Sequence, residues 1–390
     1  MIAYTFYEFD ARVRRYAETL ARRGDHVDVV ALRRDNQTIC ENINGVHLFR
    51  IQRRDIDEKG KFSYLRKLLM FLVKSMMFVS AKQLRRSYHL LHIHSVPDFE
   101  VFAALLPKLM GSKLILDIHD LVPEFYASKF HVPGSSPIVK LLKLMEHLSA
   151  GFVDHVIIAN DLWKKKLVER SVSANKCTAI LNFPDNSVFT RRGRNGHNGK
   201  FKMLYPGTLN EHQGLDLAIR AFALIKDDVP EAEFHIFGRG PCKESLAALI
   251  GNLSLEDRVF LKDHVSLLDL PPIMENSDLG VVPKIRTAFS DEAFSTKILE
   301  FMALGVPVLV ADTKIDTHYF DESLVRFFRA GDEGDLANNM LLLIRNPELR
   351  QRLSTNATAY IGKNDWESKK QIYLDLVDRL VANTRPSQAQ

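Results

Sequence analysis

Short apolar runs alternate with amphipathic helical patterns along the first half of the chain. The run Ile2–Tyr7 leads into a helical pattern that ends at Gly24, and an apolar strand follows at Val27–Leu32. A strand, a helix and a second strand in succession form the building unit of a parallel sheet. Further strands are predicted at Gly45–Ile51, Leu90–His94, Lys113–Ile118, His155–Ala159 and Thr178–Leu181, and helices at Phe99–Met110 and Ile138–Ala150.

The alternation stops at Arg191–Lys200, which lacks apolar residues and predicts an exposed linker. It then resumes, with strands predicted at Phe201–Tyr205, Glu233–Phe237, Val259–Leu261, Leu279–Val282 and Val306–Val310, and helices at Leu215–Ile225 and Glu244–Ile250. We therefore predict an α/β protein with two Rossmann-like domains, at residues 1–192 and 200–365. Such domains place a ligand cleft between the carboxyl ends of their sheets.

The tail contains two more helical patterns. One lies near Glu348–Ile361 and the other, amphipathic, at Ser368–Ala382 just after Trp366. Periodicity alone leaves two interpretations of the last helix open: it caps the second domain or returns to the first.

Composition is that of an ordinary soluble protein. A chain of 390 residues suits two domains, and 46% apolar and 26% charged residues suit a globular fold. The net charge of +5 suits an anionic substrate or membrane surface, and no nucleic-acid-binding motif accompanies it. Cys40, Cys177 and Cys242 match no zinc or redox spacing and indicate reduced thiols of a cytoplasmic protein.

Neither a secretory signal nor a spanning helix is expected. The chain opens directly on a strand-like run, and no 18-residue stretch is both apolar and uncharged.

The sharpest local pattern follows the predicted strand Leu279–Val282. Ser295 or Thr296 can cap a helix that runs to Leu304 and stops at Gly305. A helix that starts at the carboxyl edge of a sheet offers unpaired N–H groups and a positive dipole end to a diphosphate.

Charged residues surround this helix start. Glu300 can accept hydrogen bonds from a ribose diol, Glu292 can reach sugar hydroxyls, and Lys297 adds positive charge beside the phosphates. The alternative interpretation is a solvated acidic loop before a packing helix.

At this point the chain resembles the family 4 glycosyltransferases, which have the two-domain GT-B fold. The resemblance rests on Glu292-x7-Glu300 with Met302–Val308, and on Phe201–Ala221, Phe237–Pro241, Asp154–Ile157 and the Trp366 helix. It implies a retaining transfer with no bound metal or cofactor, from a nucleotide diphosphate sugar. It further implies that Glu300 holds the ribose, that Glu292 contacts the donor sugar, and that the last helix, about 366–385, returns to the first domain.

A second constellation lies at the end of the strand Lys113–Ile118. In similar enzymes the histidine matching His119 hydrogen-bonds the donor sugar, and Asp120 would lie next to the acceptor. The alternative is a histidine satisfied by backbone groups, with Asp120 capping a turn.

Weaker candidates sit in the glycine-containing and first-strand loops. Asp10 and Arg12 join the first strand to the first helix, where phosphate or acceptor contacts are common, although an exposed helix arginine is an equal interpretation. Donor contacts are also expected from the predicted loop glycines Gly207, Gly238 and Gly240.

One loop departs from the family pattern. Relatives place an arginine and a lysine after the first strand of the second domain, whereas this chain has Thr208 and Gln213. Stabilisation of the leaving group would then fall on Lys297, Arg239 or Arg286.

Metal sites are disfavoured. Asp55 and Asp57 lie in a highly charged run typical of a solvated loop. His92 and His94 share one side of a strand, but spacing places no third ligand beside them.

The segment 62–86 is strongly apolar, with Lys67, Lys74 and Arg85 near one side of the helical wheel. Such a helix either lies in an anionic membrane interface or packs on the first sheet. The first interpretation fits a lipid-linked acceptor and a peripheral position on the inner face of the plasma membrane.

Taken together, the sequence predicts a retaining, metal-independent glycosyltransferase that moves a hexose-type sugar to a glycan or lipid-linked acceptor in polysaccharide or glycoconjugate synthesis. A nucleotide-sugar epimerase and a non-catalytic nucleotide-sugar-binding subunit of a polysaccharide assembly complex are the alternatives.

Overall fold

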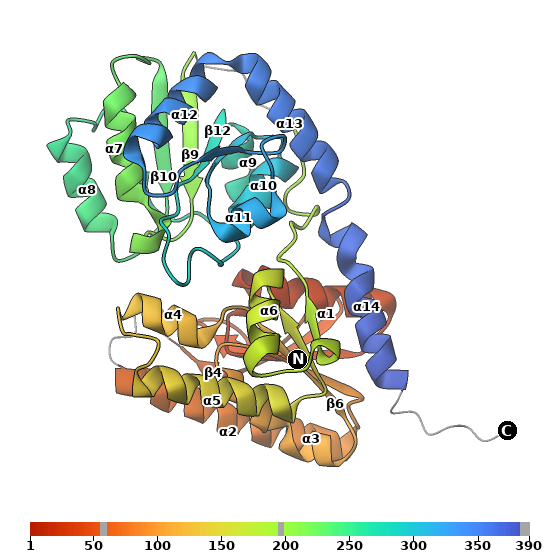
Figure 1. Cartoon of the computed structure of the whole chain (residues 1–390). Helices are drawn as coiled ribbons and strands as arrows, with labels where there is room; N and C mark the ends of the chain where they lie inside the picture. Colours follow the sequence, from red (N-terminus) through yellow and green to blue (C-terminus); the bar gives the residue numbers. More distant parts are fainter. Residues whose placement is uncertain (55–60, 194–198, 268, 383–390) are drawn as a thin grey trace. The chain divides into compact units, whose positions relative to one another are not determined.

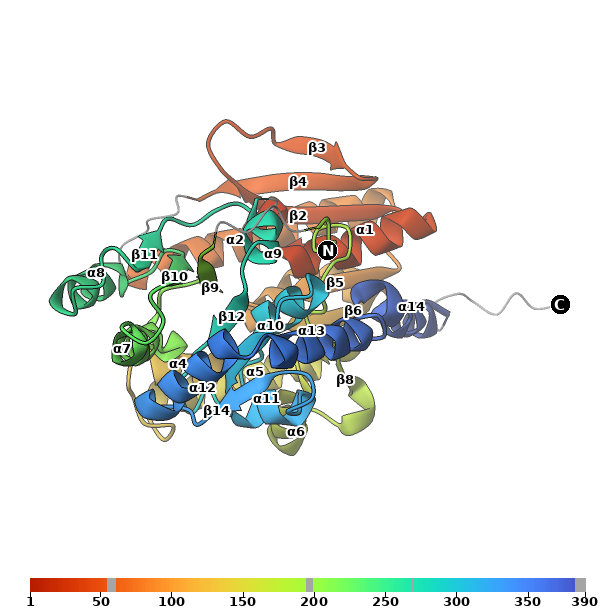
Figure 2. The ribbon, with the colours of Figure 1, turned by 90° about the horizontal axis from the view of Figure 1, so that it is seen from above.

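The computed structural model describes residues 1–54, 61–193, 199–267 and 269–382, with the backbone only at residues 61 and 62. The chain divides into two compact units, Met1–Asn182 with Lys370–Gln390, and Phe183–Lys369. Each unit has one sheet with helices packed on it (Figures 1 and 2). The first boundary therefore lies after Asn182, earlier than the predicted residue 192. The cleft predicted between the domains stays a prediction.

The first unit holds an eight-stranded sheet in the order β3-β4-β2-β1-β5-β6-β7-β8. Its strands are β1 (Ile2–Ala3), β2 (Val27–Arg33), β3 (Cys40–Ile43), β4 (Val46–Arg53), β5 (Leu90–His94), β6 (Lys113–Ile118), β7 (His155–Ile158) and β8 (Cys177–Ala179). All neighbours are parallel except β3, which the sequence analysis missed. It joins β4 through Asn44 and Gly45, both with positive φ, as a tight hairpin requires.

Helices cover the first sheet. They are η1 (Tyr7–Phe9), α1 (Ala11–Arg23), α2 (Lys61–Arg85), η2 (Asp98–Ala104), α3 (Leu105–Leu109), α4 (Val122–Lys129), α5 (Pro137–Phe152), α6 (Asp161–Arg170), η3 (Ala174–Lys176) and α14 (Trp366–Ala382). The single helix predicted at Phe99–Met110 is in fact η2 followed by α3, because Pro107 fits only in the first turn of an α-helix. None of the described helices combines the length and apolarity needed to cross a membrane.

The last helix returns to the first unit, as the resemblance implied. Asp378 of α14 pairs with Arg23 of α1 at 2.8 Å. The Tyr373 ring lies 4.2 Å from the Tyr16 ring, centroid to centroid, and its hydroxyl is 3.0 Å from Nδ1 of His92. The first unit is therefore discontinuous in sequence.

The second unit holds a fully parallel sheet in the order β11-β10-β9-β12-β13-β14. Its strands are β9 (Phe201–Pro206), β10 (Ala232–Phe237), β11 (Val259–Lys262), β12 (Leu279–Val282), β13 (Val308–Ala311) and β14 (Arg326–Phe328). Its helices are η4 (Glu211–Gln213), α7 (Leu215–Ile225), α8 (Lys243–Asn252), α9 (Leu270–Glu275), α10 (Thr296–Ala303), α11 (Lys314–Tyr319), α12 (Glu333–Arg345) and α13 (Pro347–Ile361). Gly280 of β12 lets α10 approach the sheet, because a Cβ there would meet the Phe301 ring at 2.6 Å.

Candidate active site

The α10 helix begins where the sequence predicts. Ser295 is its N-cap residue and Leu304 its C-cap residue, and Gly305 follows in the left-handed conformation (φ 70°). The predicted side-chain cap is absent, since the buried Ser295 hydroxyl has no hydrogen-bond partner among the described residues. The first N–H groups of α10 are therefore not capped by Ser295, and the helix start keeps its anion-binding character.

Lys297 lies beside Gly207 at the carboxyl end of β9. A Cβ on Gly207, whose φ is 145°, would lie 2.9 Å from Cε of Lys297, so glycine leaves room for the lysine. The Lys297 ammonium also sits 5.2 Å from the centre of the Tyr205 ring. Burial lowers the pKa of Lys297 to about 8, although the charge of Glu300 raises it. The absence of a side chain at Gly207 thus makes space for the Lys297 side chain.

Two further cationic or titratable groups lie in this region, and the sequence analysis missed both. Lys284 is buried just after β12, where its ammonium bonds Asp316 at 2.7 Å and the carbonyl oxygen of Ala293 at 2.9 Å. Burial, followed by the charges of Lys297 and Lys284, lowers the pKa of His212. The signal for Lys284 was its place directly after a buried strand, and His212 lies in the loop that lacks arginine and lysine.

The predicted glycine loop has a packing role. A Cβ on Gly238 would overlap the carbonyl oxygen of Gly207, and one on Gly240 would overlap the backbone of Leu209. Backbone hydrogen bonds from Gly207 to Phe237 (2.8 Å) and from Leu209 to Arg239 (3.0 Å) join the two loops. The glycines therefore allow two strand-end loops to pack in contact. The Arg239 side chain itself is exposed.

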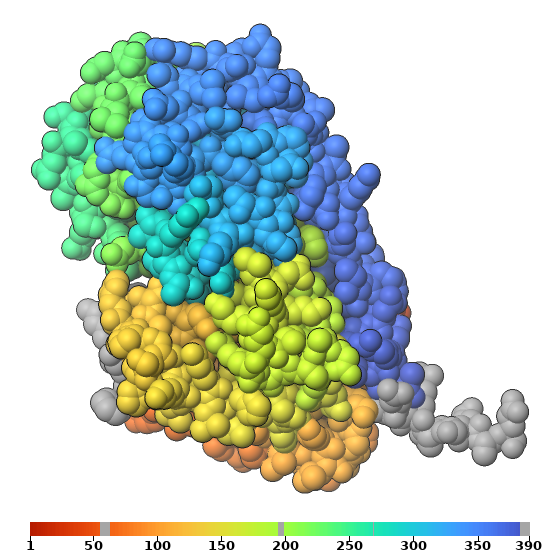
Figure 3. Space-filling model, in the orientation of Figure 1, coloured from red at the N-terminus to blue at the C-terminus, as the bar shows by residue number. Residues whose placement is uncertain are grey.

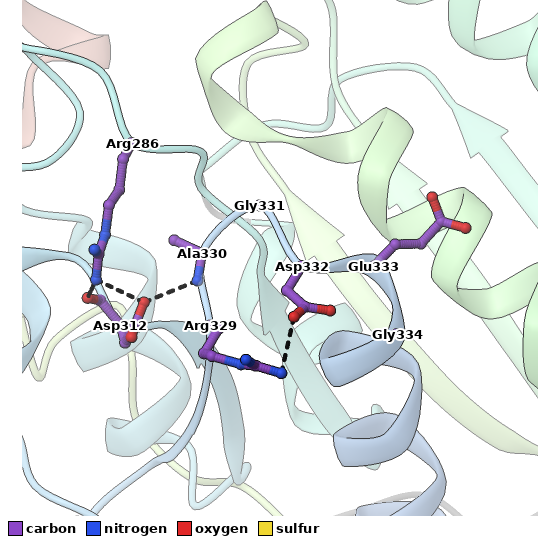
Figure 4. Close-up of a pocket in the computed structure, with 8 residues that line it drawn as sticks. All are labelled: Arg286, Asp312, Arg329, Ala330, Gly331, Asp332, Glu333 and Gly334. Carbon is purple, nitrogen blue, oxygen red and sulfur yellow. Dashed lines mark hydrogen bonds and ion pairs between the residues drawn. The ribbon is translucent and has the colours of Figure 1, made fainter.

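Arg286 is already engaged by carboxylates. Its guanidinium bonds the side chain of Asp312 at 2.9 Å and lies 3.7 Å from Asp291. It lines an open pocket of about 670 Å³ next to the start of α12, and its side chain points at Asp312 (Figure 4). Of the three cations expected to replace the missing basic pair, Lys297 is the one that the structure places at the α10 start.

Glu292 and Glu300 are both half-buried, Glu292 in the loop before α10 and Glu300 within it. Glu300 is close enough to Lys297 for its charge to raise the pKa of the lysine. The loop is fastened to α11 by Asp291, which accepts from the backbone N–H of Lys314 at 3.0 Å. The second unit thus gathers carboxylates and ammonium groups around one helix start.

In the first unit a buried carboxylate organises the end of β6. Asp117 is fully buried and accepts two hydrogen bonds from Arg12 of α1, at 2.7 and 2.8 Å. Arg12 also donates to the carbonyl oxygen of Ile180 and to Asn182. Arg12 is therefore a buried structural cation, neither the exposed helix arginine nor the free anion-binding group that the sequence left open.

His119 is the group that this carboxylate orients. Its Nε2 lies 3.1 Å from Oδ2 of Asp117, which leaves Nδ1 as the nitrogen available to a ligand. Burial acts to lower the pKa of His119, but the charge and hydrogen bond of Asp117 raise it above the ordinary value. Arg12 in turn holds the pKa of Asp117 well below its usual range despite burial. An anionic Asp117 thus favours a protonated His119.

His92 and His94 lie behind His119. Nδ1 of His94 is 3.1 Å from Oδ2 of Asp117. The rings of His92 and His94 stack with their centroids 4.2 Å apart. Burial lowers the pKa of each ring, so both favour the neutral form. The ligand atoms of His92, His94 and Asp117 lie within 4.8 Å of one another, which supplies the third group that spacing could not. A divalent cation there would add charge beside the guanidinium of Arg12, which disfavours it.

The remaining candidates are placed as follows. The Asp10 side chain caps α1, accepting from the backbone N–H groups of Arg12 and Val13. Asp120 is half-buried beside His119, and burial raises its pKa while His119 lowers it. Asp55 and Asp57 lie outside the described residues.

Family models match both halves of the chain. The model "Glycosyl transferase 4-like domain" matches residues 10–182, and "Glycosyl transferases group 1" matches residues 189–360. The chain belongs to the family 4 glycosyltransferases. The chain is 25% identical to the putative colanic acid biosynthesis glycosyltransferase WcaL of Escherichia coli K12 over 157 residues. That alignment covers 40% of the chain and 39% of the relative, so it spans about two fifths of the relative's length.

Solved structures show the same fold. Sucrose-phosphate synthase from Thermosynechococcus elongatus superposes with a TM-score of 0.80 at 19% identity, over 98% of this chain and 99% of that one. Anabaena Alr3699/HepE in complex with UDP-glucose gives 0.69 at 16% identity, over 97% and 98%. The predicted GT-B fold of this chain is thereby confirmed.

Proposed function

We propose that this chain is a retaining, metal-independent glycosyltransferase that transfers a hexose-type sugar from a nucleotide diphosphate donor. Its acceptor would be a glycan or a lipid-linked molecule in polysaccharide or glycoconjugate synthesis. The observation that carries the proposal is the start of α10, where Lys297 lies close enough to Glu300 and to Lys284 for the charge of each to shift its pKa. Its location would be cytoplasmic, peripheral on the inner face of the plasma membrane, as the sequence predicts.

The α10 start provides for the departure of the diphosphate. Helix N–H groups and the Lys297 ammonium would hold the phosphate oxygens, and Glu300 would accept from the ribose hydroxyls. Glu292 would bind hydroxyls of the donor sugar. Positive charge placed beforehand where negative charge develops stabilises the transition state without later reorganisation.

The reaction needs no protein nucleophile. The bond from the anomeric carbon to the phosphate oxygen breaks, and the acceptor oxygen bonds the same carbon on the same face. The acceptor proton passes to the departing phosphate oxygen. His119 would donate from Nδ1 to the donor sugar, since its Nε2 is held by Asp117, and Asp120 would lie beside the acceptor.

A ligand screen followed by turnover tests this function. Several nucleoside diphosphates and their sugars are screened by thermal shift, and we expect the donor to stabilise the protein by about 1 kcal/mol at several times its Kd. Turnover with the hit should survive EDTA. It should fall by about 10²–10³-fold in Glu300→Ala and in His119→Ala.

Matched controls are exposed residues of the same types. Glu256→Ala and His89→Ala should keep full turnover, because both side chains lie on the surface. Strict dependence on an added divalent metal would refute the mechanism. Release of an altered sugar from donor alone would indicate an epimerase, and binding without turnover across acceptors would indicate a binding subunit.

A further inference from the structure

The long helix α2 turns an apolar side to solvent. Five large apolar residues recur along one stripe of the helix with exposed fractions of 47–70%: Leu65, Leu69, Val73, Met77 and Leu84. The opposite side, with Leu68, Phe71 and Val79, is buried. Packing on the sheet therefore uses one apolar side of α2 and leaves a second one uncovered among the described residues.

The α5 helix repeats this arrangement. Ile138, Leu141, Leu144 and Leu148 are exposed by 43–58%, whereas Val139, Glu146, Ser149 and Ala150 are buried. The buried side is partly polar, since Glu146 pairs there with Arg170 of α6. An ordinary surface helix has the reverse distribution, with apolar residues inside and polar residues outside.

The two helices belong to one surface. Both pack against η2, and α3, which follows η2 directly, exposes Leu109 by 76% with Leu105 and Met110 beside it. Atoms of α5 adjoin those of the α2 and α3 segments along the lower edge of the first unit (Figures 1 and 3). We name the exposed apolar residues of α2, α3 and α5 the apolar face.

The charge that accompanies the apolar face is positive. α2 and α3 contain no aspartate or glutamate, and the single acidic residue of α5 is the buried Glu146. Basic residues flank the apolar stripes, namely Arg66, Lys67, Lys74, Arg85, Lys108, Lys140 and Lys143. Such a face suits an occupant that is apolar in its interior and anionic at its surface.

We infer that the apolar face docks the first unit onto an anionic lipid bilayer, with α2, α3 and α5 in the interface region. Leucine and methionine side chains would enter the acyl boundary while the flanking lysines and arginines contact lipid phosphates. The sequence predicted a membrane contact for 62–86 only. The inference adds α5, because periodicity alone does not show that its leucines face solvent.

Charge argues against a second copy of this chain as the occupant. Two apolar faces brought together would oppose one acid-free basic surface to another, and like charges across an interface suppress association. Lipid phosphates supply the opposite charge at the same depth as the basic rim.

The inference rests on the proposed function and deepens it, because a protein docked on the bilayer would find its lipid-linked acceptor there. Lipid binding can nevertheless be measured without donor or acceptor, so the two can fail separately.

The test is cosedimentation of the full chain with vesicles of phosphatidylcholine alone or with a quarter phosphatidylglycerol. We expect at least ~10-fold stronger partition onto the anionic vesicles, weakening as salt rises toward about 0.5 M. The double variants Leu69→Glu/Met77→Glu on α2 and Leu141→Glu/Leu148→Glu on α5 should each lower this partition by at least ~10-fold, since each removes apolar area and adds negative charge.

The second unit offers a matched control. Leu224→Glu/Leu342→Glu changes two exposed leucines there and should leave vesicle partition unchanged. Melting temperatures of all three variants should stay within about 2 °C of the wild type, because the replaced side chains are exposed. Thermal stabilisation by UDP serves as a separate readout of the donor site.

Three results would overturn the inference. One is equal partition onto neutral and anionic vesicles, and another is unchanged partition of the α5 variant. The third is a concentration-dependent dimer in light scattering that the same variants abolish, which would make a second copy the occupant.

Discussion

The two units treat apolar side chains in opposite ways. Among the described residues the first unit exposes eighteen large apolar side chains, whereas the second exposes Leu224 and Leu342. Both units have sheets of mainly parallel strands covered by helices, so the fold does not impose this difference. Large exposed apolar patches mark interaction sites. The exposed apolar residues of the first unit therefore suit a partner that is itself apolar.

Buried charges differ as well. The second unit pairs Lys284 with Asp316 and keeps Lys297 at a strand end, where an anion can reach it. The first unit surrounds Asp117 with Arg12 and histidines, and buries Glu100 with Ser75 as the polar neighbour that lowers its pKa. The second unit thus places a lysine at a strand end, whereas the first unit uses a buried carboxylate to orient His119.

The largest expected effect concerns Asp117. Asp117→Asn leaves the Arg12 charge buried without its carboxylate, which should lower the free energy of unfolding by about 3–5 kcal/mol. The pKa of His119 should fall, because the charge that raises it is gone. Histidine NMR titration measures this shift, with the exposed His89 as the internal control. An unchanged His119 titration would show that Asp117 does not orient this histidine.

Glu100 should give an intermediate effect. Burial raises the pKa of Glu100 to about 8 in the folded protein, although Ser75 of α2 lowers it. Because the unfolded carboxyl ionises near pH 4.5, stability should fall as pH rises from about 4.5 to 8 and level off above that. Glu100→Gln should flatten this slope and stabilise the protein by about 2 kcal/mol at pH 8, as urea unfolding at pH 5 and pH 8 would report.

A buried glutamate of the second unit is the counterpart of Glu100. Glu275 accepts the backbone N–H groups of Arg192 and Gly193 at 2.8 and 2.7 Å. Glu275→Gln should therefore destabilise by about 1 kcal/mol at both pH values. If both substitutions moved stability in one direction, the contrast between the units would fail.

The last effect concerns ligand affinity, and it arises at Lys297. Its pKa of about 8 means that the charged ammonium is lost as pH rises through 8, so affinity for the nucleoside diphosphate found in the ligand screen should weaken between pH 7 and 9. Lys297→Met should bind this nucleoside diphosphate about 10-fold more weakly at pH 7, equivalent to ~1.4 kcal/mol, with a flatter pH dependence. Calorimetric titration measures both, with Lys243→Met as the control, and a steep pH dependence retained in Lys297→Met would assign it to another group.

Local sequence patterns predicted most of the fold and the part of the candidate site that lies in the second unit. The α10 start, its Gly305 stop and the strands of both sheets other than β3 and β14 follow from periodicity and capping residues, which act over a few positions. The Arg12–Asp117 pair does not, because its partners are 105 residues apart and meet only after the sheet forms. The short edge strand β3, whose residues are mostly exposed, gave no alternation to detect.

The sequence also did not show which side of each helix packs inward. The apolar residues of α2 were visible in the sequence, but hydrophobicity on both sides of a helix does not say which side meets the sheet. On α5 the buried Glu146 reverses the usual pattern, and its partner Arg170 lies on another helix. Such inversions become visible only when the neighbours of each helix are known.

The return of α14 bears on how the protein is made. Tyr373 completes the packing around His92 and Tyr16, yet it emerges from the ribosome after the whole second unit. The first unit therefore cannot finish folding as a separate N-terminal piece during synthesis, and its nascent form must wait with this histidine cluster open. A chain truncated before α14 would lack a helix of its first domain. The residues on which this helix packs would all be present but would stay uncovered.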